Sequence, residues 1–308
     1  MRPKKKDGCI NVIARILLND FEYFEPETIS DVITFLAKHG KDTKLIAGGT
    51  DLLVDMKKGR IKSKFLVNLM KIPDSSYITE DGGGLRIGAT TTFREIEESK
   101  LIKEKYPLLF EAAQAMGTVQ IRNMATIGGN ICNALPSADI PPALVALDAK
   151  AKIVGQSGER FLPLEEFFMG IRKTTLESDE LFTEVHVQSP PARSGTAFLK
   201  ISRTASDLAT LNVAVRVTLE NNGACKEARV VVGGGVGPTL IRSRRAETLL
   251  EGKILEESLI EKTARAASEE LKPRPTSIRA SPFYKIEVSK VLVKRALMKA
   301  LDRAKTQT

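Results

Sequence analysis

The sequence predicts an α+β protein in which an α/β region is followed by a domain whose strands come before its helices. Between residues 20 and 190, apolar runs of strand length alternate with runs of helical period, which is typical of α/β units. After residue 195, strand-length runs come first and long helical runs follow, which indicates an α+β domain. The segment 189–195, rich in Pro, Ser and Gly, is the predicted linker between the two parts.

The N-terminal part, residues 20–190, is expected to form two subdomains, at about residues 20–75 and 76–190. Its first helix can be capped by Thr28 or Ser30, and Gly40 ends it. We expect the stretch 119–130 to be irregular. The predicted strands are 21–26, 44–46, 65–69, 85–89, 151–154, 160–162 and 181–187, and the predicted helices are 28–38, 91–98, 107–116 and 138–147.

The C-terminal part, residues 195–308, is expected to contain a three-stranded antiparallel sheet with helices. The tripeptide Asn221-Asn222-Gly223 has the composition of a hairpin turn between the last two strands. Residues 1–19 are expected to be a loose, basic N-terminal extension. The predicted strands are 196–201, 211–219 and 225–233, and the predicted helices are 242–250, 255–271 and 285–304.

The composition argues against several classes of protein. No apolar run approaches the length of a membrane-spanning helix, so no membrane span is expected. The net charge of +9 is spread along the chain, with 4 Tyr and no Trp for base stacking. We therefore expect no nucleic-acid partner, and interpret the charge as a basic surface that can meet acidic partner subunits.

The cysteines and histidines are too few for a metal cluster. The 3 cysteines, Cys9, Cys132 and Cys225, are far apart, and they cannot supply the four thiolates that an iron–sulfur cluster usually needs. They also form no disulfide framework, so a reducing, cytoplasmic compartment is expected. The 2 histidines, His39 and His186, are isolated in the sequence, and no histidine-based metal site is expected.

Two glycine pairs are the strongest candidates for ligand binding. The stretch Ala47–Leu52 follows a predicted strand with Gly-Gly-Thr-Asp, and Thr126–Asn130 reads Thr-Ile-Gly-Gly-Asn. Adjacent glycines let the backbone approach a ligand, and their N–H groups in a concave turn suit a phosphate group. Two such loops could hold opposite sides of a diphosphate. A tight strand-to-helix turn without a ligand is an equally good interpretation of the first loop alone.

The role of Asp139 stays open, and a third glycine-rich stretch is not interpreted as a nucleotide-binding loop. Asp139 could accept a hydrogen bond from a sugar hydroxyl or an adenine amine, or it could cap the helix that follows. The stretch Gly233–Pro238 does not match the dinucleotide-binding glycine motif, because proline stands where the third glycine would fall. We interpret it as a left-handed turn at the end of a strand.

These motifs resemble those of the FAD-binding (medium) subunits of the molybdenum hydroxylases, the family of xanthine dehydrogenase and carbon monoxide dehydrogenase. The resemblance covers roughly residues 20 to 305, and the second glycine loop with its Gln-Ile-Arg lead-in is its most specific part. The matching stretches are 21–26, 47–52, 85–89, 120–130, 168–174 and 278–281.

The resemblance implies a fold and a set of cofactor contacts. The N-terminal region would have the FAD-binding fold of the vanillyl-alcohol-oxidase (PCMH) type, with FAD between its two subdomains. Both glycine loops would contact the FAD diphosphate, and the stretch 206–212 would lie beside the flavin ring. The implied cofactor-binding residues are Leu45, Ile46, Ala47, Gly48, Gly49, Thr50, Asp51, Leu52, Thr126, Ile127, Gly128, Gly129, Asn130, Asp139, Phe182 and Lys200.

The resemblance also implies partners. A large subunit would carry molybdopterin and a small subunit two [2Fe-2S] clusters, assembled as a dimer of heterotrimers. FAD would exchange electrons with a terminal acceptor or donor, possibly NAD(P), and no side chain would act as an acid or base. The alternatives are a self-contained flavin oxidoreductase of the same fold and a scaffold subunit without flavin.

Two departures from the family pattern are visible. Only residues 131–138 separate Asn130 from Asp139, which leaves no room for the iron–sulfur insertion of the 4-hydroxybenzoyl-CoA reductases. Ser277 stands where the family turn often has an aspartate, so any contact made by that carboxylate is in doubt.

Overall fold

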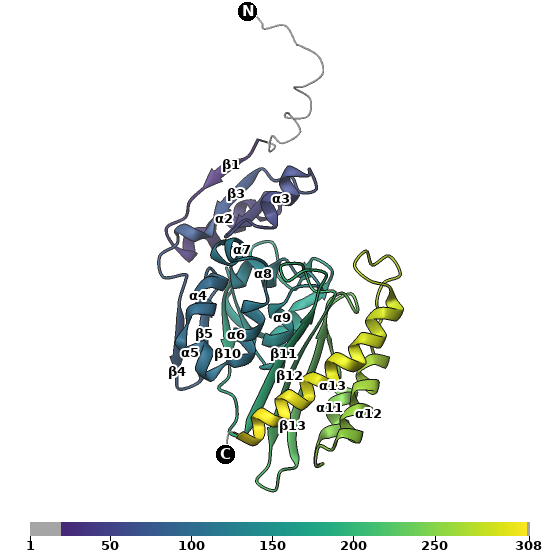
Figure 1. The fold of residues 1–308 in the computed structure, drawn as a ribbon. Coiled ribbons are helices and arrows are strands. Elements are labelled where there is room, and N and C mark those ends of the chain that lie inside the picture. The colour runs from purple at the N-terminus through teal and green to yellow at the C-terminus, as the bar shows by residue number, and fades with distance from the viewer. Residues whose placement is uncertain (1–19, 307–308) are drawn as a thin grey trace, which may run out of the picture.

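The computed structural model describes residues 20–306, which form three connected parts (Figure 1). The first part is a small parallel sheet of order β1-β3-β2 with one long helix, α2. Thr28 caps α2 through a capping box with Asp31, which confirms one of the two expected caps. Its elements are β1 (Glu22–Phe24), α2 (Ile29–His39), β2 (Thr43–Ile46), α3 (Leu52–Lys57) and β3 (Phe65–Asn68), with 3-10 turns at Gly40–Asp42 and Leu69–Lys71.

The second part is a five-stranded antiparallel sheet of order β4-β5-β10-β6-β7, covered by helices. Pro107 occupies the first turn of α6, as expected. The strands are β4 (Ile78–Asp81), β5 (Gly84–Gly88), β6 (Lys150–Gly155), β7 (Gly158–Pro163) and β10 (Leu181–Val187), and a separate hairpin pairs β8 (Phe168–Gly170) with β9 (Lys173–Thr174). The helices are α4 (Phe93–Glu98), α5 (Lys100–Lys105), α6 (Pro107–Gln114), α7 (Val119–Met124), α8 (Ile127–Cys132), α9 (Ile140–Ala146) and α10 (Leu164–Phe167).

The stretch 119–130, expected to be irregular, is largely helical, so that prediction was wrong. It forms α7 and the start of α8, and a threonine caps each helix. Thr118 accepts a hydrogen bond from the backbone N–H of Ile121, and Thr126 accepts one from Gly129. The glycine pair of the second loop therefore lies inside a helix, where the caps outweigh the low helix propensity of glycine.

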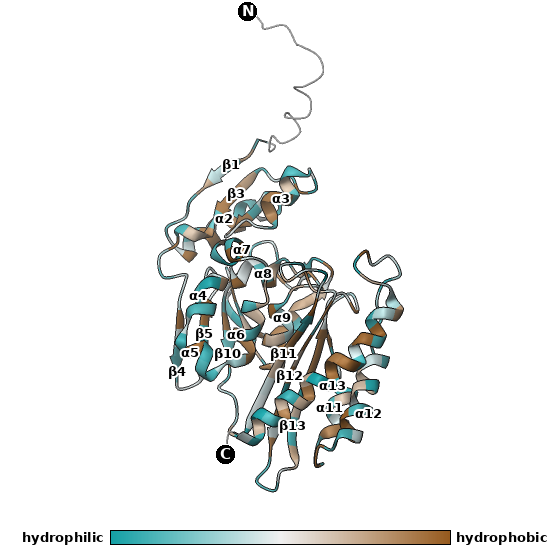
Figure 2. Cartoon of the chain, viewed as in Figure 1, coloured by the Kyte–Doolittle hydropathy of each residue, from teal (hydrophilic) through white to brown (hydrophobic). Residues whose placement is uncertain are grey.

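The C-terminal part is a sheet of order β11-β12-β13-β14 whose two faces are both covered. Helices α6 and α9 of the second part pack on one face, α11 and α13 pack against the other, and α12 packs on α11 and α13. All residues of β12 are buried as a result, and Figure 2 shows apolar residues concentrated between the layers. The elements are β11 (Ser194–Ile201), β12 (Leu211–Leu219), β13 (Cys225–Gly233), β14 (Ile241–Arg242), α11 (Arg244–Leu250), α12 (Glu257–Glu269) and α13 (Pro282–Thr306).

The sheet has the three long strands that the sequence predicts, and the short β14 adds a fourth strand at the edge beside β13.

Ionic contacts also fix the second part to the C-terminal part. The carboxylate of Glu111 accepts from Arg303 at 2.6 Å, Lys299 at 2.9 Å and the backbone N–H of Phe198 at 2.9 Å. Among residues 20–306, no helix is both long enough and apolar enough to cross a membrane.

Candidate cofactor site

A cleft of about 710 Å³ opens between the two N-terminal subdomains and borders the C-terminal part. Its volume lies within the range of small-molecule and cofactor sites. The first subdomain supplies the stretches 44–52, 55 and 60–61, and the C-terminal part supplies 206–208, which lie between β11 and β12. The second subdomain contributes Met116, Gly117, Ile121, Ala125, Thr126, Gly129, Asn130, Cys132, Asn133, Ala138, Asp139 and Arg172.

The first glycine loop connects β2 to α3 along one wall of this cleft. Gly49 has φ +69°, a conformation that favours glycine. A Cβ on Gly48 would lie 1.8 Å from the carbonyl oxygen of Met124, so only glycine lets this loop reach the end of α7. Within residues 20–306, the backbone N–H groups of Gly48, Gly49, Thr50 and Asp51 have no hydrogen-bond acceptor. The loop therefore presents a set of free donors on the cleft wall.

The second glycine loop differs, because its N–H groups are already used. Ile127 donates to the carbonyl of Thr91 at 2.9 Å, Gly128 to Ala89 at 2.9 Å, and Asn130 to Thr126 at 3.0 Å. Gly129 donates to the side chain of Thr126 at 3.1 Å. The prediction that both loops offer backbone donors to a diphosphate therefore applies to the first loop only.

The two glycines of the second loop have different surroundings. Gly128 is buried, and a Cβ there would lie 2.7 Å from the carbonyl oxygen of Ala89, so this glycine serves packing. Gly129 is exposed and lines the cleft, and a Cβ there would contact only the Thr126 hydroxyl, at 3.0 Å. Gly129 thus leaves room in the cleft, whereas Gly128 lets α8 approach β5.

Asn130 also lines the cleft, and its side-chain oxygen is buried without a hydrogen-bond partner among residues 20–306. Buried polar atoms are rarely left unpaired, so this amide indicates a ligand with a polar hydrogen. An FAD molecule has ribityl and ribose hydroxyls and a diphosphate. Free donors on the first loop and a free acceptor on Asn130 are the groups that such a molecule needs, so the residues present fit FAD.

Asp139 lies at the deep end of the cleft in a buried network. It occupies the cap position of α9, but its carboxylate makes no capping bond, so the capping interpretation was wrong. Instead Oδ2 accepts from the ammonium of Lys200 at 2.7 Å, and Oδ1 accepts from the amide of Asn212 at 3.0 Å. Lys200 also donates to the carbonyl of Ala115 at 2.7 Å. Burial raises the pKa of the Asp139 carboxyl, and the Lys200 charge opposes the rise.

A second charged group in the cleft was not predicted from the sequence. Asp55, on α3, is 3% exposed, and its carboxylate accepts from Arg172 at 2.6 Å and from Arg60 at 3.2 Å. Burial raises the pKa of Asp55, but the hydrogen bonds and charges of the two arginines outweigh it and lower the pKa below its usual value. Arg172 belongs to the second subdomain, so this ion pair joins the two subdomains across the cleft.

A hydrogen bond from the Asn133 amide to Asp51, at 2.9 Å, makes a second link across the cleft. The sequence signal for both links was weak. Asp55 and Arg172 are 117 positions apart, and no local pattern pairs a carboxylate with an arginine at that distance.

Four predicted residues do not line the cleft. Ile127 and Gly128 are buried beneath it, in the core of the second subdomain. Phe182 is 3% exposed and packs edge-on against Phe167, with ring centroids 5.7 Å apart. Lys200 reaches the cleft only through Asp139. The other predicted residues, Leu45 to Leu52, Thr126, Gly129, Asn130 and Asp139, lie together on its walls.

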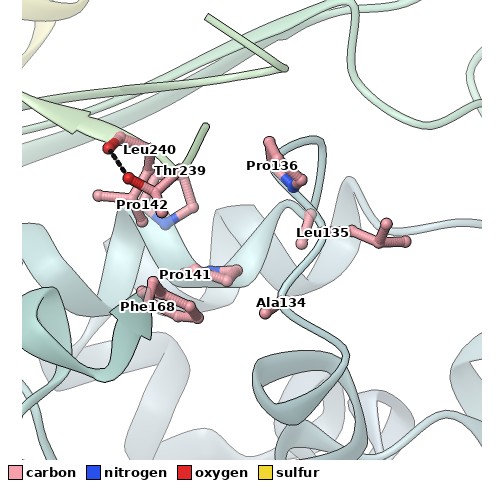
Figure 3. Close-up of a pocket in the computed structure, with 9 residues that line it drawn as sticks. Ala134, Leu135, Pro136, Pro141, Pro142, Phe168, Thr239 and Leu240 are labelled. Atoms are coloured by element: carbon pink, nitrogen blue, oxygen red, sulfur yellow. Dashed lines mark hydrogen bonds between the residues drawn. The ribbon is translucent and has the colours of Figure 1, made fainter. Parts of the chain in front are cut away.

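The other hollows are poor candidates for a cofactor. Figure 3 shows an apolar hollow between Pro141, Phe168 and Leu240, whose volume of about 10 Å³ leaves room for roughly one water molecule. A second, of about 160 Å³, lies beside Arg86, Lys150 and His186. No group of three or more His, Cys, Asp or Glu side chains in residues 20–306 could hold a metal ion.

One cysteine, Cys132, lines the cleft. Burial raises the pKa of Cys132 to about 12, so this thiol stays neutral. Cys225 is buried in the C-terminal sheet, and both cysteines are free. Cys9 lies outside the described residues.

Comparisons with known proteins agree with this geometry. Residues 19–190 match the family model for the FAD-binding domain in molybdopterin dehydrogenase, and residues 196–300 match the C-terminal domain of the carbon monoxide dehydrogenase flavoprotein. The chain is 36% identical to the alpha subunit of the 6-hydroxypseudooxynicotine dehydrogenase complex of Paenarthrobacter nicotinovorans, over 92% of this chain and 96% of that subunit.

Solved structures agree as well. A chain of carbon monoxide dehydrogenase from Hydrogenophaga pseudoflava superposes with a TM-score of 0.90 at 33% identity, over 93% of this chain and 99% of that one. A chain of quinoline 2-oxidoreductase from Pseudomonas putida 86 gives a TM-score of 0.87 at 27% identity, over 94% and 99% of the two chains.

The fold and the comparisons together define a flavoprotein, whose FAD-binding domain has a cleft of cofactor size between its two lobes. More particularly, the chain belongs to the FAD-binding medium subunits of the molybdenum hydroxylases, the family of carbon monoxide dehydrogenase and xanthine dehydrogenase. It is therefore an oxidoreductase subunit with FAD as its cofactor.

Proposed function

We propose that this chain is the electron-transfer subunit of a cytoplasmic, multi-subunit molybdenum-containing dehydrogenase. FAD bound here would pass electrons between the iron–sulfur clusters of a small partner subunit and a terminal acceptor such as NAD(P). A large partner subunit would hold molybdopterin and the substrate, with the whole assembled as a dimer of heterotrimers. The observation that carries the proposal is the cleft between the lobes, with its row of free backbone donors at Gly48–Asp51.

The chain's own residues would bind and orient the cofactor. The donors of the first loop suit the two charges of a diphosphate, because backbone N–H groups can surround an oxyanion without a counter-ion of their own. Asn130 and the Asp139 carboxylate offer acceptors for ribityl and sugar hydroxyls. Phe182 and the buried Ile127 and Gly128 would support the site through packing, and Lys200 would hold the Asp139 side chain in place through their hydrogen bond.

The bound FAD would supply the redox chemistry, and the protein would position it. The Cys132 thiol, which lines the same cleft, would stay protonated beside the cofactor, because burial raises its pKa. The subdomain links Asp55–Arg172 and Asp51–Asn133 join the two walls of the cleft, so the cofactor would lie between two linked lobes.

The substrate would be chosen elsewhere in the complex. The relatives carry names that refer to a pyridine alkaloid, carbon monoxide and quinoline, although their chains share this fold. The proposed FAD would occupy the cleft between the lobes, which supports a substrate pocket on another subunit.

FAD titration of the purified chain tests the proposal. We expect saturable binding with a stoichiometric amount of flavin, seen by visible absorbance and by quenching of flavin fluorescence. Loss of binding in Asn130→Ala with an unchanged melting temperature would support the assigned cleft. A chain that binds no FAD under any refolding condition would refute the proposal and favour a scaffold subunit. Substrate-dependent dye reduction by the isolated flavoprotein would instead favour a self-contained oxidoreductase.

A further inference from the structure

The loop between α12 and α13 and the start of α13 expose large apolar side chains. Within the loop, Ile278 is 90% exposed, and the first residues of α13 follow with Phe283 at 74% and Tyr284 at 45%. Figure 1 shows this loop projecting beyond the ends of the two helices. We call residues 274–284 the basic loop. Large apolar side chains gathered on one exposed segment are typical of protein–protein contacts.

Both ends of the basic loop are fixed to the glycine turn after β13. The backbone N–H of Lys272 donates to the carbonyl of Val236 at 2.6 Å. At the other end, the ammonium of Lys285 donates to the carbonyls of Gly234 at 2.7 Å and Gly235 at 3.2 Å. A segment fixed at both ends loses less conformational entropy when it binds a partner.

The glycine turn has the conformation that the sequence suggests. Gly234 and Gly235 have φ of +93° and +72°, so both are left-handed. Their N–H groups both donate to the carbonyl of Pro136, at 2.8 and 3.0 Å. Pro136 precedes Ala138 and Asp139 in the cleft wall. The basic loop is therefore held at a fixed position relative to the cofactor cleft.

The charges of the basic loop are not balanced within the described chain. Arg274, Arg279 and the 3%-exposed Lys285 form no salt bridge with any acidic residue of the range 20–306. The Arg279 Nε is buried without an acceptor, and the first turn of α13 carries no acidic residue. Burial lowers the pKa of Lys285, and the nearby Arg279 and Arg274 lower it further. Gathered cations without an anion are costly, and an external carboxylate would relieve that cost.

We propose that the basic loop is a docking surface for a partner subunit of the dehydrogenase complex, whose contact face offers carboxylates beside an apolar pocket. The proposal rests on the proposed function, because it needs that complex to exist. Ile278 and Phe283 are the apolar anchors, and Arg274 and Arg279 pair with the partner's carboxylates. Such an arrangement, with apolar anchors bordered by charged pairs, matches the anatomy of specific interfaces.

Co-expression of this chain with its molybdopterin and iron–sulfur subunits tests the proposal. The variants are Ile278→Asp, Phe283→Asp and the double charge reversal Arg274→Glu/Arg279→Glu. We expect each to weaken assembly by at least about tenfold, measured by titration of the purified partners. Raising the salt concentration should weaken the wild-type complex more than the charge-reversed one.

Matched controls lie elsewhere on the same domain. Ile254→Asp changes an apolar residue that is 56% exposed in the loop before α12, and Lys226→Glu reverses an exposed charge on β13. Both should assemble like the wild type. FAD content should stay normal in all variants, because none of them touches the cleft. Normal FAD content with unchanged assembly in every basic-loop variant would overturn the docking surface, whereas a wild-type chain without FAD would count against the proposed function instead.

Amide hydrogen exchange of the wild-type protein is a second test of the docking surface, and it needs no variant. Residues 274–284 should become protected in the complex relative to the free subunit, while residues 220–224, in the β12–β13 turn, should not. Unchanged exchange of the basic loop in the assembled complex would also overturn the proposal.

Discussion

The two glycine loops look alike in sequence but differ in whether their backbone N–H groups already donate hydrogen bonds within the protein. In the first, the N–H groups of Gly48, Gly49, Thr50 and Asp51 have no acceptor within residues 20–306, and all four residues line the cleft. In the second, the N–H groups of residues 127–130 are all paired with oxygens of the protein. A glycine pair is therefore not by itself an anion site. Whether it can bind an anion depends on whether its N–H groups already have acceptors within the protein.

We therefore expect the two loops to contribute to FAD binding in different ways. The first loop supplies hydrogen-bond donors, which suits it to the diphosphate. The second supplies space and the acceptor of Asn130, because Gly129 leaves the cleft open and Gly128 lets α8 pack close to β5. Three glycine variants can break or sharpen this division.

The largest effect is expected for Gly48→Ala. The new Cβ would lie 1.8 Å from the carbonyl oxygen of Met124, which is backbone and cannot move aside easily. We expect a loss of roughly 3 kcal/mol in the free energy of unfolding, with loss of FAD, because the donors of the first loop move with it. Chemical denaturation and FAD titration measure the two effects.

Gly82→Ala is the control for this variant, since a Cβ there meets nothing within 4 Å. It should change stability by less than about 0.5 kcal/mol and leave FAD binding intact. If Gly48→Ala kept full affinity for FAD, the first loop would not be the diphosphate site.

Gly128→Ala should have a smaller effect, and chiefly on stability. Its Cβ would lie 2.7 Å from the carbonyl oxygen and 2.8 Å from the Cβ of Ala89. The gain in helix propensity, about 1 kcal/mol, offsets part of an overpacking cost of roughly 1–3 kcal/mol. We expect a net loss of about 1 kcal/mol with FAD affinity changed by less than about threefold. Thermal melts with and without FAD separate the two.

Ala89→Gly added to Gly128→Ala removes one of the two close contacts, so the double variant should recover part of the packing loss. A deficit larger than the sum of the two single changes would show that the strain at Gly128 has another source.

Much of the fold was predictable because it depends on local patterns. The long strands β11, β12 and β13 and the capped helix α2 have clear apolar periods with turn residues at their ends. The stretch 119–130 was missed because its signals conflict. Thr118 and Thr126 are good caps, but the helices they begin are short and the second contains two glycines.

The sequence could predict the part of the site that one short segment forms. It could not predict the contacts between residues that lie far apart in the sequence. The first loop could be recognised because its adjacent glycines, threonine and aspartate stand in one short segment, in which Gly49 has a left-handed conformation. The partners of Asp139, Lys200 and Asn212, come from strands 61 and 73 positions away, and only the folded chain shows that the carboxylate turns to them and leaves the helix end uncapped. The link from Asp55 to Arg172 is hidden for the same reason.

The smallest effect, and the sharpest test, is expected for Gly129→Ala. Its Cβ would contact only the Thr126 hydroxyl, at 3.0 Å, and would otherwise enter the cleft. Alanine favours the helix by up to about 1 kcal/mol, so the free energy of unfolding without FAD should stay the same or rise. FAD affinity should fall by about fivefold, or about 1 kcal/mol, because the methyl group takes space from the cofactor. Gly128→Ala should show the opposite pair of results, with lower stability and nearly unchanged affinity, so the two neighbours serve as controls for each other. If Gly129→Ala bound FAD as tightly as the wild type, the second loop would not contact the cofactor, and the first loop with the Asp139 network would hold it alone.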